Sequence, residues 1–480
     1  MGIHVNSLYY NITYKFLFSL LFSYPVPVNL KNWWNFGFLS AIFLMVQIVT
    51  GVFLTFFYIP DSLLAYDSVQ VIMREINYGW FVRYVHLNGA AFFFLMVYFH
   101  VGRGVYYKSY FFPRINVWIT GVTILFCMMG TAFLGYVLPW GQMSFWAATV
   151  ITNFLTAIPV IGKNITFWVW GGYAINAVTL TRFFSLHFLL PFVILLLVLL
   201  HILFLHDTRS STPIGVMVQK YLFASFHPYF FAKDGLFLVY VLAVFVYIVG
   251  ILGPELLNHS DNYIPANPMV TPPHIVPEIY FLPYYGILKT ISHKLVGIIA
   301  MFISIFILLV LPFVSVSTET HKTIGRSIVI GEGQNFFNSN SLFGLVLANF
   351  LSLGYLGGEN PDYPWISVGA IANHMYMLGF FVFLGLHVSR VSLYSSGFDP
   401  FTEFLSVVAL KRDINFDYSF LGLNSTYIDS YTSISAEELA SGDEDIVNNM
   451  EKSSLKSVPG GTGRNSGDSL FSFKFDLNFF

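Results

Sequence analysis

Two apolar segments, each carrying two histidines fourteen residues apart, constrain this sequence more than any other feature. The first segment holds His86 and His100, and the second holds His187 and His201. Fourteen residues make just under four helical turns, so the histidines of one segment share a face about 21 Å apart along the axis. Each segment is long and apolar enough to cross a bilayer. Ionisable residues are costly at that depth and indicate a functional site.

The relative direction of these two helices decides how the histidines pair. One apolar segment, residues 117–138, lies between them, so strictly alternating crossings make the two histidine helices parallel. His86 then faces His187, and His100 faces His201. A bis-imidazole pair fills both axial positions of a haem iron, which favours electron transfer over oxygen binding. A lone intramembrane histidine is more often a polar helix–helix contact, but four at matched spacing predict two haems.

Glycines repeat the same fourteen-residue period in two other apolar segments. Gly37 and Gly51 lie in the first predicted span, and Gly121 and Gly135 lie in the third. Glycine allows a flat group or a backbone to approach closely. Packing of small residues between helices is the commoner cause of such patterns. Because the period matches that of the histidines, it favours two macrocycles stacked within one helical bundle.

Composition supports a membrane protein and limits the cofactor chemistry. The chain is 56% hydrophobic and 10% charged, whereas an average soluble domain is about 25% charged. Its net charge of -2 gives no argument for nucleic-acid binding, and membrane lipid is the expected surrounding. Cys127 is the only cysteine, which excludes an internal disulfide and the C-x-x-C-H attachment motif. Any haem is therefore held without covalent bonds to the protein.

These observations predict an all-α integral membrane protein with eight transmembrane helices, of which the first four form a di-haem four-helix bundle. Besides the two histidine segments, spans are placed at about 36–59, 117–138, 235–253, 295–314, 341–356 and 367–388. Four regions follow: an interfacial segment at 1–32, the bundle at 33–215, a C-terminal membrane region with a proline-rich surface lid at 216–395, and a polar extension at 396–480. From Asp399 onward lie 13 of the 25 acidic residues and 6 of the 23 basic ones, so this extension is expected to be disordered or bound to a partner.

Several strings together resemble the cytochrome b family of the mitochondrial and bacterial bc1 complexes. They extend over about residues 33–390, in one unbroken chain as in the mitochondrial form. The matching strings are WNFG, GWFVRYVHLNG, HVGRG, GYVLPWGQMSFW, TRFFSLHFLLPF, HILFLHD, FHPYFFAKD, PEIY and YLGGENPDYPWI. The resemblance implies a subunit of ubiquinol–cytochrome c reductase. This enzyme oxidises ubiquinol at one membrane face, passes electrons through two b haems and reduces ubiquinone at the other face, which contributes to proton translocation in a Q cycle.

The resemblance also implies partners and roles for individual residues. The expected partners are the Rieske iron–sulfur protein, cytochrome c1 and the other subunits of a dimeric complex, in the mitochondrial rather than a bacterial inner membrane. His86 and His187 would bind the low-potential haem near quinol oxidation, and His100 and His201 the high-potential haem near quinone reduction. The remaining implied residues are Arg83 and Arg103 for haem propionates, Glu278 and Tyr280 for quinol oxidation, and Asn35, His206, Ser210, Lys233 and Asp234 for quinone reduction.

Some of these roles have plainer alternatives. An arginine at a helix end can simply extend its charge to the interface, and Glu278 can cap the helix that follows it. His206 taken alone is an ordinary interfacial histidine. Lying five residues beyond His201, however, it points away from the haem-binding face and is free to contact quinone.

The chain departs from the family pattern at a few positions near these sites. Ile279 stands where the family motif has tryptophan, Leu87 where alanine is usual, and Arg209 where glycine is usual. Ala147 replaces a glycine at a tight point of the oxidation pocket. We therefore hypothesise that Ala147 belongs to this quinone site and excludes strobilurin-type inhibitors while leaving quinol oxidation intact.

Other classes of protein remain open from the residues alone. A di-haem anchor of a membrane dehydrogenase would explain the histidines but needs neither the lid nor the second group of spans. A haem-free transporter could use buried histidines as proton relays. A haem–copper oxidase is disfavoured, because the sequence has no adjacent histidines. The extension could in addition serve as an assembly platform.

Overall fold

The computed structural model describes residues 24–111, 113–213, 223–314 and 339–392. Residues 1–23 of the predicted interfacial segment lie outside these ranges. Residues 315–338, which connect two predicted spans, and the whole predicted extension 396–480 lie outside them as well. Within them the chain is predominantly helical, which confirms the predicted class. The long apolar helices are α2 (Phe36–Thr55), α4 (Gly79–Tyr106), α5 (Ile115–Val137), α8 (Ala177–Thr208), α9 (Tyr229–Tyr247), α11 (Lys294–Val314), α12 (Ser339–Gly358) and α13 (Trp365–Ser392).

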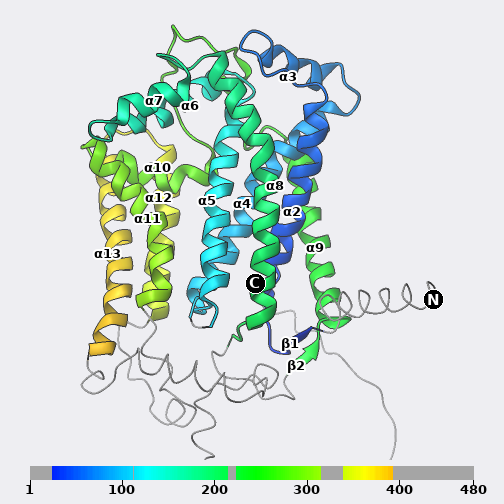
Figure 1. Ribbon diagram of the computed structural model, residues 1–480, viewed down its shortest axis with the longest axis vertical. Helices are drawn as coiled ribbons and strands as arrows, with labels where there is room; N and C mark the ends of the chain where they lie inside the picture. Colours follow the sequence, from blue (N-terminus) through cyan, green and yellow to red (C-terminus); the bar gives the residue numbers. More distant parts are fainter. Residues whose placement is uncertain (1–23, 112, 214–222, 315–338, 393–480) are drawn as a thin grey trace, which may run out of the picture. The chain divides into compact units, whose positions relative to one another are not determined.

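Seven candidate membrane spans are found among the described residues. The remaining predicted span, at 341–356, falls on α12, whose apolar stretch Leu342–Gly358 is shorter than the others. The shorter helices lie between the long ones: α3 (Ala65–Arg74), α6 (Gln142–Thr152), α7 (Gly162–Trp170) and α10 (Leu282–Lys289). Helices α6 and α7 follow α5 in the chain and lie beyond one end of the long helices (Figure 1).

Four long helices hold the histidine and glycine positions. α2 packs along α4, and α5 packs along α8, and all four lie side by side in Figure 1. The chain enters α8 through a complete capping box. The Asn176 side chain accepts hydrogen bonds from the backbone of Val178 and Thr179, and the Thr179 hydroxyl accepts one from the Asn176 backbone. This satisfies amide groups that a helix start otherwise leaves unpaired.

Buried aromatic and aliphatic side chains join these four helices to α9 and α11. One core cluster includes residues of α2, α4, α5, α9 and α11. Polar contacts bridge the same elements. The Trp118 indole donates to the Leu308 carbonyl at 2.6 Å, and the Tyr98 hydroxyl donates to the Tyr280 carbonyl at 2.6 Å. The second contact fixes the PEIY stretch against α4, so the proline-rich lid is a structured part of the fold.

Two features were not predicted. Strand β1 (Pro25–Pro27) pairs antiparallel with β2 (Phe223–Ser225), so the all-α prediction missed a small sheet. Its strands are three residues long and lie nearly 200 residues apart, which leaves no alternating pattern in the sequence. Helix α3 was also missed. It is short and amphipathic, with Ala65, Val69 and Ile72 buried on one side.

Candidate functional site

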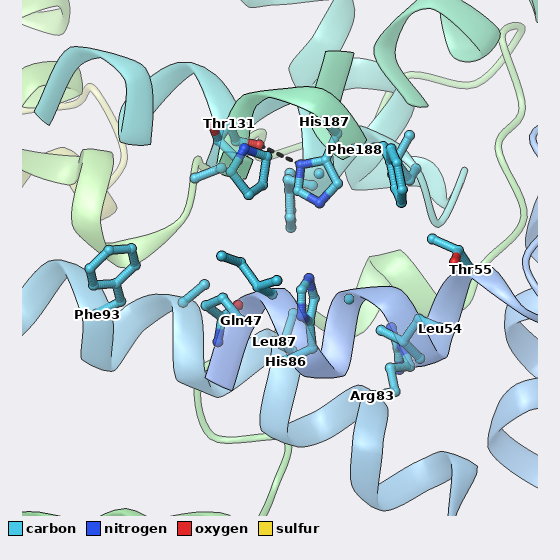
Figure 2. A pocket seen from close by; sticks show the side chains of 18 of the residues that line it. Gln47, Leu54, Thr55, Arg83, His86, Leu87, Phe93, Thr131, His187 and Phe188 are labelled. Atoms are coloured by element: carbon cyan, nitrogen blue, oxygen red, sulfur yellow. Dashed lines mark hydrogen bonds between the residues drawn. The ribbon is translucent and has the colours of Figure 1, made fainter. Parts of the chain in front are cut away.

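The two histidine pairs have nearly the same separation of their ring centres. His86 on α4 and His187 on α8 point toward each other in Figure 2, with ring centres 6.2 Å apart and ring planes at 88°. His100 and His201, on the same two helices, have ring centres 6.3 Å apart and planes at 65°. Helix direction and the fourteen-residue spacing place both pairs between the same elements.

These separations match two imidazoles bound to a single metal. Metal–nitrogen bonds are about 2 Å long and each ring centre lies about 1.1 Å behind its nitrogen, so axial imidazoles have centres about 6 Å apart. Among the described residues, no group of three or more His, Cys, Asp or Glu side chains is placed to hold a metal ion, so each histidine pair offers two such ligands.

The Nδ1 atoms of all four histidines have hydrogen-bond partners. Such contacts fix the orientation of a metal-binding ring and leave Nε2 for the metal. The partner of His100 Nδ1 is Nη2 of Arg103 at 3.3 Å. The other three contacts are His86 to the Thr50 hydroxyl at 2.9 Å, His201 to the Thr120 hydroxyl at 3.1 Å, and His187 to the Thr131 carbonyl at 2.8 Å.

Each of the four periodic glycines faces one histidine ring. A Cβ built on the glycine would meet the Cε1 atom of that histidine at 3.1 Å or less, which is closer than ordinary van der Waals contact. The pairs are Gly37 with His100 at 3.0 Å, Gly51 with His86 at 3.1 Å, Gly121 with His201 at 3.1 Å, and Gly135 with His187 at 2.3 Å. The glycines are therefore required for the approach of α2 and α5 to the histidine helices.

A cavity of about 220 Å³ surrounds the first histidine pair. Its lining includes both histidines and their two glycines, and Arg83 and Leu87 also lie along it (Figure 2). Glu278 and Tyr280, from the PEIY stretch, line the same cavity. The structure thus brings the predicted carboxylate of the oxidation site to the predicted site of the first haem.

The two predicted propionate-binding arginines are both held near histidine pairs. Arg83 is buried and donates to the Tyr263 hydroxyl at 3.4 Å. The guanidinium of Arg103 lies 5.0 Å from the centre of the Trp34 ring. Within the described part of the chain, the buried Nε atom of Arg103 has no hydrogen-bond partner. Because a buried donor without a partner is costly, this atom fits an anionic group bound beside His100.

Glu278 is a buried carboxyl group at the cavity wall. Burial raises its pKa to about 7, and a hydrogen bond from Tyr136 acts in the opposite direction. Although Glu278 precedes the short 3-10 helix Ile279–Phe281, its side chain makes no capping hydrogen bond. The capping alternative is therefore wrong. Tyr280 is held in place by stacking on Phe94, with ring centres 4.3 Å apart and planes at 6°.

The residues predicted for quinone reduction come from helix ends on the other side of the structure. Asn35 precedes α2, His206 lies in the last turn of α8, and Lys233 and Asp234 lie near the start of α9. Strands β1 and β2 lie at the same end of the long helices, at the bottom of Figure 1. Lys233 donates to the Leu30 carbonyl at 2.6 Å. The buried Asn35 amide nitrogen has no partner among the described residues.

Sequence reasoning missed one residue at this end. Tyr24 stacks on His206 with ring centres 4.3 Å apart, and Ser210 donates a hydrogen bond to its phenol oxygen. Tyr24 lies about 180 residues from both partners. Its only signal in the sequence is its position directly before the Pro25-Val26-Pro27 break.

The positions that depart from the family pattern have different surroundings. Leu87 lines the cavity of the first histidine pair, and Ile279 is 54% exposed. Ala147 is buried on α6 but is not among the residues that line this cavity. Arg209 has a backbone φ of 62° and ψ of 167°, a conformation that favours glycine. This explains physically why glycine suits that position.

Fold and site together define a helical membrane protein with several candidate spans and two facing histidine pairs between α4 and α8. The family described as Cytochrome b/b6/petB matches residues 21–209, and Cytochrome b(C-terminal)/b6/petD matches residues 265–377. Cytochrome b of Acanthamoeba castellanii is 48% identical over 365 residues, covering 76% of this chain and 91% of the relative. That of Phytophthora megasperma is 48% identical over 367 residues, covering 75% and 91%.

A solved structure is similar as well. The structure entitled "Hyperthermophilic respiratory Complex III" superposes with a TM-score of 0.71 at 32% identity, covering 80% of this chain and all of the other. The chain belongs to the cytochrome b family. Because the family matches extend over both groups of spans, the dehydrogenase-anchor and haem-free transporter alternatives are set aside.

Proposed function

We propose that this chain is the cytochrome b subunit of a respiratory complex III, a quinol–cytochrome c reductase. The observation that carries the proposal is the pair of equivalent histidine sites on α4 and α8, one of which shares a cavity with Glu278. Two redox sites about 21 Å apart along one helix pair provide a path for electrons across the membrane. The family membership supports the same conclusion.

Two non-covalent b haems are the proposed cofactors. His86 with His187, and His100 with His201, would hold the irons, and Gly37, Gly51, Gly121 and Gly135 leave room beside the rings. Bound haem would supply one-electron chemistry at each site. Arg83 and Arg103 would hold the propionates, because a guanidinium forms charge-assisted hydrogen bonds with carboxylates.

Glu278 is the proposed proton acceptor for quinol oxidation. Its pKa of about 7 allows it both to take up and to release a proton near neutral pH, which suits a general base. Tyr280 would shape the quinol pocket beside it. Ala147, which is buried on α6, would narrow the quinol pocket at a point outside the cavity of the first histidine pair.

Quinone reduction is proposed at the opposite end. His206 and Asp234 would donate hydrogen bonds and protons to the quinone oxygens. Lys233, Ser210 and Asn35 would complete the polar lining. Among the described residues the buried amide nitrogen of Asn35 has no partner, which supports a role in ligand binding, because buried donors are rarely left without one.

The wider organisation follows the family. We infer eight spans, with α12 as the one of shorter apolar length, and a di-haem four-helix bundle made of α2, α4, α5 and α8. The proposed partners are the Rieske iron–sulfur protein, cytochrome c1 and further subunits in a dimeric complex. The eukaryotic relatives support a location in the mitochondrial inner membrane.

A redox titration of the purified complex tests the proposal. The reduced-minus-oxidised visible spectrum should resolve two b-type components at separate potentials, with two non-covalent haems per chain. A His201→Leu variant should lose one component and retain the other. A chain that binds no haem, or one haem only by direct stoichiometry, would contradict the proposal.

A further inference from the structure

Tyr24 is fixed against the end of α8 by several contacts. Its ring stacks on the imidazole of His206, with centres 4.3 Å apart and planes at 22°. Its hydroxyl donates to the Leu205 carbonyl at 3.2 Å, and Ser210 donates to the phenol oxygen. Tyr24 therefore bridges two residues of the proposed quinone-reduction site.

The backbone of Tyr24 is anchored independently of its side chain. Its carbonyl accepts a hydrogen bond from the Phe226 amide at 2.9 Å, and the next residues pair with β2. Burial raises the pKa of Tyr24 to about 12, although Arg209 and Arg114 act to lower it. The phenol is therefore a neutral hydrogen-bond donor at physiological pH, and its position follows from the small sheet.

This stacking limits how a quinone can approach His206. A flat ring inserted between the phenol and the imidazole would need a separation of about 7 Å, two contact distances of about 3.5 Å. The observed separation is 4.3 Å. One face of His206 is thus closed by Tyr24, which leaves the edge with the ring nitrogens, or the opposite face, for a ligand.

We propose that Tyr24 is a positioning residue of the quinone-reduction site, which holds the His206 imidazole so that quinone is bound at its nitrogen-bearing edge. The inference rests on the proposed function and adds a residue to that site. Aromatic pairs contribute about 0.5–1.5 kcal/mol beyond their buried area. Loss of the stack should therefore weaken quinone binding by roughly 2- to 10-fold, whereas the maximal rate should change little.

The test compares Tyr24→Leu, which removes both the stack and the hydroxyl, with Tyr24→Phe, which keeps the stack. Tyr240→Leu is the matched control, because Tyr240 is 60% exposed on α9. The assay follows haem reduction by a short-chain quinol in the purified complex, with the oxidation site blocked by an inhibitor. It yields an apparent KM and a maximal rate, and haem content is measured alongside.

We expect an increased KM in Tyr24→Leu, a smaller increase in Tyr24→Phe, none in Tyr240→Leu, and native haem content in all three. An unchanged KM in Tyr24→Leu would overturn the proposal, as would a loss of haem and maximal rate at unchanged KM. The variant His206→Asn distinguishes a failure of the Tyr24 proposal from a failure of the proposed quinone-reduction site. If it raises KM while Tyr24→Leu does not, only the Tyr24 proposal fails. If it leaves KM unchanged, the assignment of quinone reduction to this end fails as well.

Discussion

Substitution of Gly135 by alanine would test the histidine-pair geometry at its tightest contact. The added Cβ would lie 2.3 Å from Cε1 of His187, and 2.8 and 2.9 Å from its two ring nitrogens. Ordinary carbon contacts are about 3.5–4.0 Å, so the imidazole has to move by about 1 Å. A metal–nitrogen bond of about 2 Å cannot absorb a displacement of that size.

The effect on folding should be much smaller than the effect on the haem site. Overpacking typically costs about 1–3 kcal/mol, and replacing glycine by alanine inside a helix returns about 1 kcal/mol. The variant should therefore still assemble. We expect it to lose the b-type component of the first histidine pair and to keep that of the second.

The same helix supplies the comparisons. Gly130→Ala is the matched control, because a Cβ at Gly130 meets no heavy atom within 4 Å, and it should keep both components. Gly121→Ala, where the contact to His201 would be 3.1 Å, should shift the potential of the other component without abolishing it. The assay is a redox titration of the visible spectrum with haem stoichiometry. Two components at native potentials in Gly135→Ala would refute the reasoning.

Three further predictions concern the oxidation site and the chain backbone. The rate of quinol oxidation, measured by stopped-flow kinetics, should rise with pH and show an inflection near pH 7, since the Glu278 carboxylate is the proton acceptor and its pKa is about 7. Glu278→Gln should be roughly 100-fold slower and should lack this inflection. Tyr136→Phe should show the inflection at higher pH. A pH-independent native rate would contradict this. Arg209→Gly should stabilise the complex by roughly 1 kcal/mol by relieving the left-handed backbone, seen as a raised Tm, whereas Arg209→Ala, which retains a Cβ, should not; equal Tm values would count against strain. Native activity should resist a strobilurin and Ala147→Gly should be inhibited; full sensitivity of the native enzyme would disprove the steric hypothesis.

Much of the membrane architecture could be predicted because it depends on local properties of the chain. Apolar length locates the spans, and the boundaries of α2 and α5 fall within four residues of the predicted ones. The structure begins α9 at Tyr229 rather than Gly235, because Lys233 and Asp234 lie inside the helix, in its second turn. Sequence patterns place span ends poorly where polar residues continue the helix.

The histidine and glycine positions were also accessible to sequence reasoning. Helical periodicity alone places His86 and His100 on one face of α4, and alternation of spans makes α4 and α8 parallel. Gly135 can then face His187 if α5 and α8 are neighbours, because the glycines of α5 and the histidines of α8 have the same fourteen-residue spacing. What the pattern could not supply was the contact distance, which depends on how closely α5 and α8 pack.

The sequence by itself thus determined most of the spans, the histidine positions and the matching period of the glycines, because helix geometry repeats along the chain and acts over a few turns. Tertiary structure decided the rest. It brought Glu278 to the cavity of His86 and His187, set its pKa through burial, and stacked Tyr24 on His206 through strands far apart in the chain. These features arise from contacts between segments separated by about 90 residues or more, for which no local periodicity exists.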